Sequence, residues 1–352
     1  MPGTILPPLQ FTKIRCMAVE GGKKLFGCVL ALLFVDFLAA GAARQMAAEE
    51  PTPSISAIDS LGLADAEAAQ LRQSINAHDY IAAEKILLGE IAHDPHSRFA
   101  AQRLAFAGSV YFLDRDYLNA AIAWKKSQAI APLAPALRFS LAMAYIRMGH
   151  SDWARRELES LVEQDKSNAL YPYWLGRLDY DGHEYNNAIR HFQHAIELDP
   201  GMARAYDNLG LCYYYQNANA LAVENYKKAI ELDRSSQHPS AWPYLNLAIT
   251  QQFLNQLKDA EANLQEALRL DPQLAPAHFQ LGSVLEDSGR LQEAIAEFKQ
   301  AALLDATYPE PHMAMARIYH KLGQEQPARE EVQTYLKLHR KPNPPVPARS
   351  TR

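Results

Sequence analysis

The chain has 352 residues, of which 48% are hydrophobic and 21% are charged, and its formal net charge is −5. This balance gives no basic field, so we expect no nucleic-acid partner. The three cysteines (Cys16, Cys28 and Cys212) lack the spacing of a zinc or redox site, and we expect neither a metal nor a cofactor.

Residues 1–43 are predicted to be a leader. Lys23 and Lys24 precede an apolar run, LFGCVLALLFVDFL, which is followed by the small residues AAGAA. This order of a positive, an apolar and a small-residue region is typical of a cleaved export signal, which we place at residues 17–43.

The alternative for the leader is a membrane anchor formed by residues 25–43. These 19 residues are just enough to span a bilayer. Asp36, near the middle of the run, disfavours a stable span. Both interpretations place the rest of the chain outside the cytoplasm, periplasmic or secreted, with membrane contact only through this segment.

Two segments connect the leader to the rest of the chain. Residues 44–63 contain Pro51, Pro53 and several Ser and Ala residues, and we predict a flexible linker. Residues 64–100 are predicted to form a degenerate capping repeat, since terminal units of an array are usually atypical.

Residues 169–202 are predicted to form two short helices. Trp174, Leu175 and Leu178 give the first helix an apolar face, and Asp181-Gly182-His183 ends it. The second helix carries its own apolar stripe. Two amphipathic helices of this length cannot bury both faces alone, so we expect neighbouring copies of the pair.

Copies occur at intervals of 34 residues, with one interval of 38 that contains an insertion at 237–240. A small residue recurs in the first helices: Gly108, Ala142, Gly176, Gly210, Ala248, Gly282 and Ala316. A larger side chain recurs in the second helices: Trp124, Leu158, Phe192, Tyr226, Leu264, Phe298 and Val332.

This 34-residue helix–turn–helix pattern resembles the tetratricopeptide repeat (TPR), and the resemblance covers roughly residues 64–340. It implies an all-α, right-handed TPR solenoid of about eight helix–turn–helix repeats, with seven of them in residues 101–340. The remaining residues, 341–352, are basic and proline-rich, and we predict a disordered tail.

The resemblance also implies a binding surface, because one stripe of the first helices faces the concave groove in TPR proteins. Its candidate residues here are Phe139, Met143, Arg147, Tyr173, Arg177, Tyr180, Asn208, Leu211, Tyr214, Tyr215, Asn246, Ile249, Phe253 and Phe279. Tyrosine-rich surfaces suit a peptide, since each ring supplies contact area and a hydrogen bond. The alternative is that these rings pack against the neighbouring repeat.

Two known TPR binding modes fit incompletely. The lysine-then-asparagine pair that clamps a terminal carboxylate is missing. An asparagine ladder that grips a peptide backbone is present only in part, as Asn208, Asn246 and Gln280. Asp179 occupies a position that is tyrosine in several other units, and it either bonds locally or faces the groove.

The chain carries none of the P-loop, GxSxG, GxGxxG or HExxH motifs, and we expect no enzyme activity. His191 and His194 share a helix face without an evident third ligand. We therefore predict a scaffold or adaptor that binds a protein or peptide in the groove. The alternative is an assembly factor of an envelope, pilus, polysaccharide-export or secretion complex, acting through its convex face, tail or self-association.

Overall fold

The computed structural model describes residues 55–339. The predicted leader, residues 44–54 of the predicted linker and the predicted tail lie outside these described residues.

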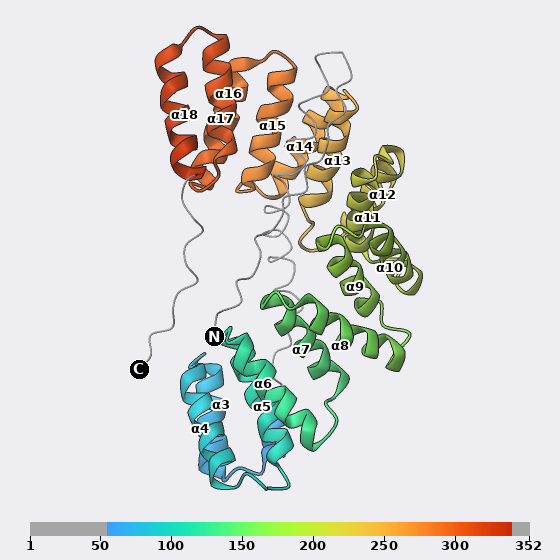
Figure 1. The fold of residues 1–352 in the computed structure, drawn as a ribbon, viewed down its shortest axis with the longest axis vertical. Helices are drawn as coiled ribbons and strands as arrows, with labels where there is room; N and C mark the ends of the chain where they lie inside the picture. The colour runs from blue at the N-terminus through green and yellow to red at the C-terminus, as the bar shows by residue number, and fades with distance from the viewer. Residues whose placement is uncertain (1–54, 340–352) are drawn as a thin grey trace, which may run out of the picture. The chain divides into compact units, whose positions relative to one another are not determined.

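Within residues 55–339 the chain forms sixteen α-helices and one 3₁₀ helix, and no strand (Figure 1). The elements are η2 (Ile55–Leu61), α3 (Asp65–Asn76), α4 (Tyr80–His93), α5 (Ala100–Leu113), α6 (Tyr117–Ile130), α7 (Pro135–Arg147), α8 (Ser151–Gln164), α9 (Leu170–Asp181), α10 (Tyr185–Leu198), α11 (Ala203–Tyr215), α12 (Asn219–Asp233), α13 (Trp242–Phe253), α14 (Leu257–Leu270), α15 (Ala275–Asp287), α16 (Leu291–Leu304), α17 (Glu310–Lys321) and α18 (Glu325–His339).

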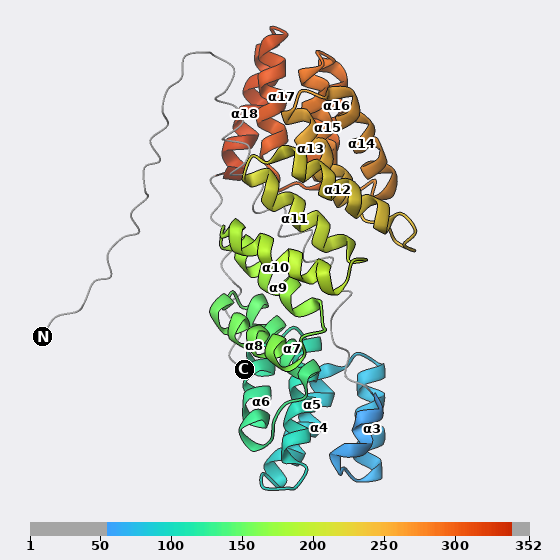
Figure 2. The same cartoon turned by 90° about the vertical axis from the view of Figure 1, so that its right-hand side faces the viewer.

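Successive helices pack as hairpins that stack on one another (Figure 2). The two helices of each hairpin are in contact, as in α9 with α10, and the second helix also contacts the first helix of the next hairpin. First helices touch one another along the stack, as α9 does α11 and α11 does α13. The all-α solenoid predicted from the sequence is confirmed.

In several hairpins, a glycine of the first helix packs directly against a large ring of the second helix. A Cβ atom built on Gly108 would lie 2.6 Å from Trp124, and one on Gly176 would lie 2.8 Å from Phe192. Gly210 and Gly282 meet rings in the same way. Where the sequence has alanine at this position, the partner position is aliphatic: Ala142 with Leu158, Ala248 with Leu264, and Ala316 with Val332.

One residue in the turn of each hairpin adopts the left-handed backbone region. Gly149, Asn217, Asn255, Gly289 and Gly323 occupy this position with φ between 59° and 79°. Glycine and asparagine reach this region at low cost, which is why they mark the turns in the sequence. The other hairpins place His78, Arg115 and His183 there.

Residues 55–61 differ from the flexible linker expected at 44–63. They form η2, in which Ile58 and Leu61 are buried. Arg103 of α5 donates hydrogen bonds to the carbonyl oxygens of Leu61 and Gly62, at 3.0 and 2.9 Å. Burial of two apolar side chains and these bonds order this part of the segment.

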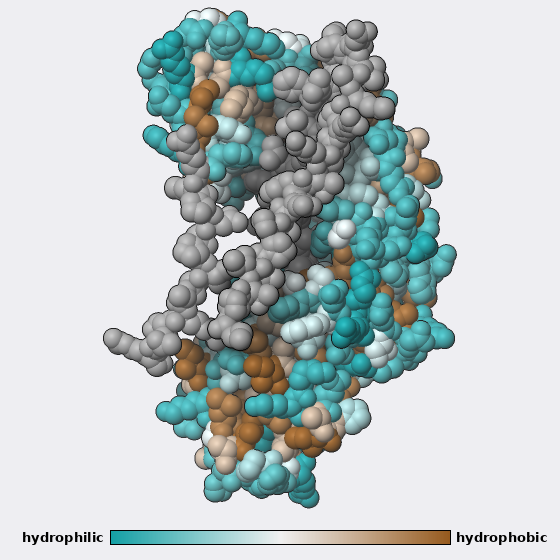
Figure 3. All heavy atoms as spheres, viewed as in Figure 1, coloured by the Kyte–Doolittle hydropathy of each residue, from teal (hydrophilic) through white to brown (hydrophobic). Residues whose placement is uncertain are grey.

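The surface changes character along the array. Figure 3 shows hydrophobic residues (brown) gathered over the N-terminal helices α4 to α6, whereas hydrophilic residues (teal) predominate over α8 to α12. In the part of the chain that the structure describes, we find no helix with the length and apolar character needed to cross a bilayer.

Candidate functional site

Five aromatic rings from three consecutive hairpins form a connected group, which we call the tyrosine cluster. Tyr185 stacks on Tyr215 with centroids 5.1 Å apart, and Tyr180 meets Tyr215 edge-on at 5.9 Å. Tyr214 lies 5.6 Å from Tyr215 and 6.4 Å from Phe253. The rings stand where α9, α11 and α13 end and α10 begins, so the cluster follows the turn edge of the array.

The tyrosines of the tyrosine cluster are neutral near pH 7, because their pKa values lie above the ordinary one. Burial, and then the neighbouring Tyr215, raises the pKa of Tyr185 to about 12. Burial also raises the pKa values of Tyr180, Tyr214 and Tyr215 above the ordinary value. Phe253 is 57% exposed, so its ring is available to an apolar partner group.

Arg177 ties α9 to α11 beside this cluster. Its Nη1 donates a hydrogen bond to Asn208 Oδ1 at 2.5 Å, and Nη2 lies 3.4 Å from Asp181 Oδ1. The Asn208 amide donates to Tyr173 Oη at 3.4 Å and to the Arg204 carbonyl at 2.8 Å. Arg177 and Asn208 therefore help to fix the position of α9 against α11.

The side chains of the partial amide ladder form hydrogen bonds between neighbouring first helices. Asn208, Asn246 and Gln280 are all buried. Asn246 donates to Asp207 of α11 at 2.9 Å, and the Gln280 amide donates to Gln252 of α13. Each amide thus bonds to the preceding first helix, and a peptide backbone would have to replace these contacts.

Burial is the main cause of the shifted pKa values of three side chains on α9 and α11. It raises the pKa of Asp207 to about 6 although Asn246 donates to the carboxylate. It raises the pKa of Tyr173 to about 12. Arg204 stacks over the Tyr173 ring at 4.7 Å, and burial lowers its pKa to about 10.

The other candidate residues pack within or between hairpins. Phe139 lies 5.8 Å from the Tyr171 ring, and Phe279 lies 5.4 Å from Phe298. Of the remaining candidates, Met143 and Leu211 are buried. Arg147 and Ile249 are half-buried. The structure thus brings Tyr180, Tyr214, Tyr215 and Phe253 together, and adds Tyr185, which the first-helix pattern had missed because it lies on a second helix.

Asp179 bonds locally, which settles the alternative left open by the sequence. Its carboxylate accepts hydrogen bonds from Arg155 Nη2 of α8 and His191 Nδ1 of α10, each at 2.6 Å. Asp179 is 1% exposed. Across residues 55–339, no three His, Cys, Asp or Glu side chains gather in a group that could hold a metal.

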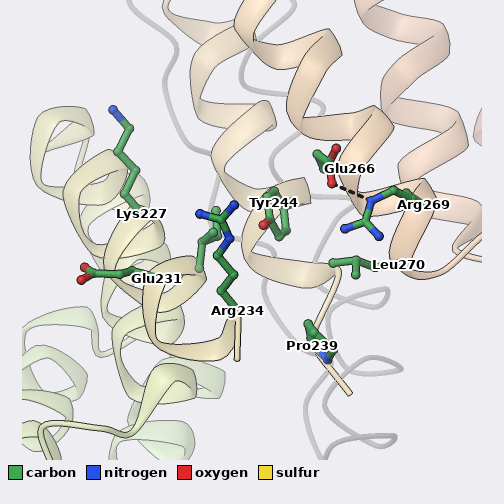
Figure 4. Close-up of a pocket in the computed structure, with 9 residues that line it drawn as sticks. Lys227, Glu231, Arg234, Pro239, Tyr244, Glu266, Arg269 and Leu270 are labelled. Atoms are coloured by element: carbon green, nitrogen blue, oxygen red, sulfur yellow. Dashed lines mark hydrogen bonds and ion pairs between the residues drawn. The ribbon is translucent and has the colours of Figure 1, made fainter. Parts of the chain in front are cut away.

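A concave feature lies near the insertion at 237–240. It is a pocket of about 460 Å³ with lining residues Lys227, Ile230, Glu231, Arg234, Pro239, Tyr244, Glu266, Arg269 and Leu270. Figure 4 shows the α12 and α14 side chains on either side of Tyr244, with Arg269 bonded to Glu266 at 2.8 Å. Its mixed charge singles out no ligand class.

Family comparisons agree with the repeat pattern. Tetratricopeptide repeat models match residues 201–273, 245–310 and 285–346. The solved structure of PilW, titled a widely conserved type IV pilus biogenesis factor, superposes with a TM-score of 0.54 at 23% identity. The superposition covers 59% of this chain and 94% of that chain, and it shows the fold alone. The chain therefore carries tetratricopeptide repeats.

Two curated proteins are similar over part of the chain. The Hsp70-Hsp90 organizing protein of Triticum aestivum is 27% identical over 126 residues, 36% of this chain and 21% of that protein. The lipoprotein NlpI homolog of Haemophilus influenzae is 28% identical over 182 residues, 49% of this chain and 55% of that protein. The chain thus spans about a fifth and about half of these relatives. A protein-interaction scaffold of the TPR type fits these similarities.

Proposed function

We propose that the chain is a non-catalytic scaffold that binds a segment of a protein partner through its first helices, with the tyrosine cluster as the anchor. The observation that carries this proposal is the continuity of the five rings across α9, α10, α11 and α13. Stacked repeats commonly present such extended surfaces to partners.

The chemistry of the tyrosine cluster defines the class of segment. Tyrosine rings supply large contact area at a low cost in side-chain entropy, and their neutral hydroxyls donate hydrogen bonds to backbone carbonyls. Exposed Phe253 provides an apolar contact at one end. We expect the partner segment to carry an aromatic or aliphatic side chain flanked by unpaired backbone carbonyl groups.

We also propose that the chain acts outside the cytoplasm. This rests on the positive, apolar and small-residue order of residues 17–43. The words lipoprotein and type IV pilus biogenesis factor in the names of similar proteins support it. An assembly role in an envelope or pilus complex is the second candidate, favoured by the same likeness to PilW.

The anchor is tested with the double variant Tyr214→Ala/Phe253→Ala. Phe253 is exposed and Tyr214 is half-buried, whereas Tyr173 and Tyr180 are buried and their loss would also affect stability. Peptides selected on the full chain from a displayed random library should bind the variant about tenfold more weakly, since an interface aromatic often contributes 1 kcal/mol or more. Isothermal titration calorimetry measures the dissociation constants.

Trp153→Ala is the matched control for this experiment. Trp153 is also an exposed aromatic, 49% exposed, and its ring contacts are with His150 and Tyr145 rather than with the rings of the cluster. The control should bind the selected peptides as the unmodified chain does. Equal affinities for all three proteins would show that the anchor lies elsewhere.

A further inference from the structure

The outer faces of α4 and α6 carry exposed aliphatic side chains. Ile81 is 74% and Leu88 47% exposed on α4, and Leu118 is 54% and Ile122 43% exposed on α6. The spacings of seven and four residues place each pair on one helix face. Because α5 packs against both helices, the two faces belong to neighbouring hairpins.

The exposed charges on these two helices have one sign. Among the Lys, Arg, Asp and Glu side chains of these two helices, the exposed ones are Lys85 on α4 and Lys125 and Lys126 on α6. In residues 80–93 and 117–130, all of which the structure describes, no carboxylate is exposed. The six later second helices each expose at least one: Asp152, Glu197, Glu224, Asp259, Glu293 and Glu325.

The carboxylates near α4 are engaged or weakly charged. Asp79 accepts a backbone hydrogen bond at the start of the helix at 3.0 Å. Glu90 pairs with Arg103 at 3.1 Å. Burial, followed by the charges of nearby aspartates, raises the pKa of Glu84 to about 7. The helices α4 and α6 themselves therefore expose aliphatic groups and lysines. Opposing charge comes from Asp94 and Asp114, which are exposed in the loops that flank the helices, and from Glu157 of α8, which lies 3.7 Å from Lys125.

We propose that the outer faces of α4 and α6 dock on the surface of a bilayer that contains anionic lipids. The aliphatic side chains enter the boundary between headgroups and acyl chains, and the lysines meet the anionic headgroups. The helices lie along the surface, because neither is long and apolar enough to cross it. A negatively charged surface over an apolar interior complements a face that is both aliphatic and cationic.

Matched labels on the full chain test this docking. With Cys16→Ser and Cys28→Ser in place, Ile81→Cys or Leu303→Cys carries an environment-sensitive fluorophore; both positions are 74% exposed. Burial keeps Cys212 out of the reaction and raises its pKa to about 12. Membrane attachment through residues 25–43 would be common to both labelled proteins, so the comparison isolates the α4–α6 face.

Vesicles of phosphatidylglycerol and phosphatidylcholine should shift the emission of the label at residue 81 to the blue, and spin-labelled lipid should quench it. The label at residue 303 should not respond, and neither should residue 81 with phosphatidylcholine alone. The variant Lys85→Gln/Lys125→Gln/Lys126→Gln should need about a hundredfold more anionic lipid, since each lysine contributes about fivefold. Far-UV circular dichroism verifies that this variant is folded.

Three outcomes would overturn the proposal. The first is an equal response at residues 81 and 303. The second is an equal response to vesicles with and without phosphatidylglycerol. The third is a shift at residue 81 that needs no lipid and grows with protein concentration, which would show that a second copy of the chain covers this face.

Discussion

Asp179→Asn is expected to lower the free energy of unfolding by about 3 kcal/mol at pH 7, because one buried carboxylate joins three helices. Asp179 receives hydrogen bonds from Arg155 of α8 and His191 of α10. Asparagine removes the negative charge and turns an N–H group toward one of the two donors. The partner side chains are 31% and 34% exposed, so water compensates part of the loss.

The effect of Asp179 should depend on pH. Burial raises the pKa of Asp179, but the hydrogen bonds from His191 and Arg155 outweigh burial and hold the pKa below its ordinary value of 3.8. A depressed pKa in the folded state means that the carboxylate stabilises the fold above the unfolded-state pKa, and that this contribution is lost as the pH falls through the folded-state pKa. The difference between the two proteins should therefore be full at about pH 5 and shrink below about pH 4.

Urea denaturation gives the total change for Asp179→Asn, and amide hydrogen exchange locates it. Arrays of repeats can open locally, so the loss of protection should concentrate in α8, α9 and α10. Asp181→Asn is the matched control, because Asp181 lies on the same helix but is exposed. Its ion pair with Arg177 is long, at 3.4 Å, and therefore weak. It should change stability by less than about 0.5 kcal/mol. Equal effects of the two substitutions would contradict the bridging role of Asp179.

The hydrogen bonds of Asp179 are related to a change in the repeat pattern. The change is visible in the sequence, but its consequence becomes clear only from the structure. Two later hairpins use a histidine near the start of the first helix to bind a glutamate of the second: His278 with Glu297, and His312 with Glu331. Pro172 occupies that first-helix position in the central hairpin and has no side-chain donor or acceptor. The second-helix position, His191, pairs with Asp179 instead.

The fold could be predicted from the sequence because small residues, ring positions and turn residues repeat at one interval. The partners of polar side chains could not. Asn208, Asn246 and Gln280 align in sequence, yet their bonds depend on how far each hairpin is rotated against the preceding one. Tyr185 joins the tyrosine cluster from the start of a second helix, α10. The sequence signal for it is the tyrosine that begins another second helix, Tyr117 of α6.

Gly176→Ala tests the contact that sets the distance within a hairpin. Alanine is the better helix former by about 1 kcal/mol, yet we expect the variant to lose about 2 kcal/mol of stability. The new Cβ atom would lie 2.8 Å from two ring atoms of Phe192, which is fully buried and has no room to move away. Gly89→Ala is the control, since its Cβ atom meets nothing within 4 Å. It should be neutral or stabilising by up to about 1 kcal/mol.

Phe192→Leu should rescue Gly176→Ala. Alone, Phe192→Leu leaves a cavity and should cost about 1–2 kcal/mol. Together the two changes recreate the alanine–leucine pair of two other hairpins in this chain, such as Ala142 with Leu158. A double-mutant cycle by urea denaturation should therefore give a favourable coupling of about 2 kcal/mol. Additive losses would mean that the cost of Gly176→Ala arises within α9 and not from the Phe192 ring. Other contacts would then set the distance between α9 and α10.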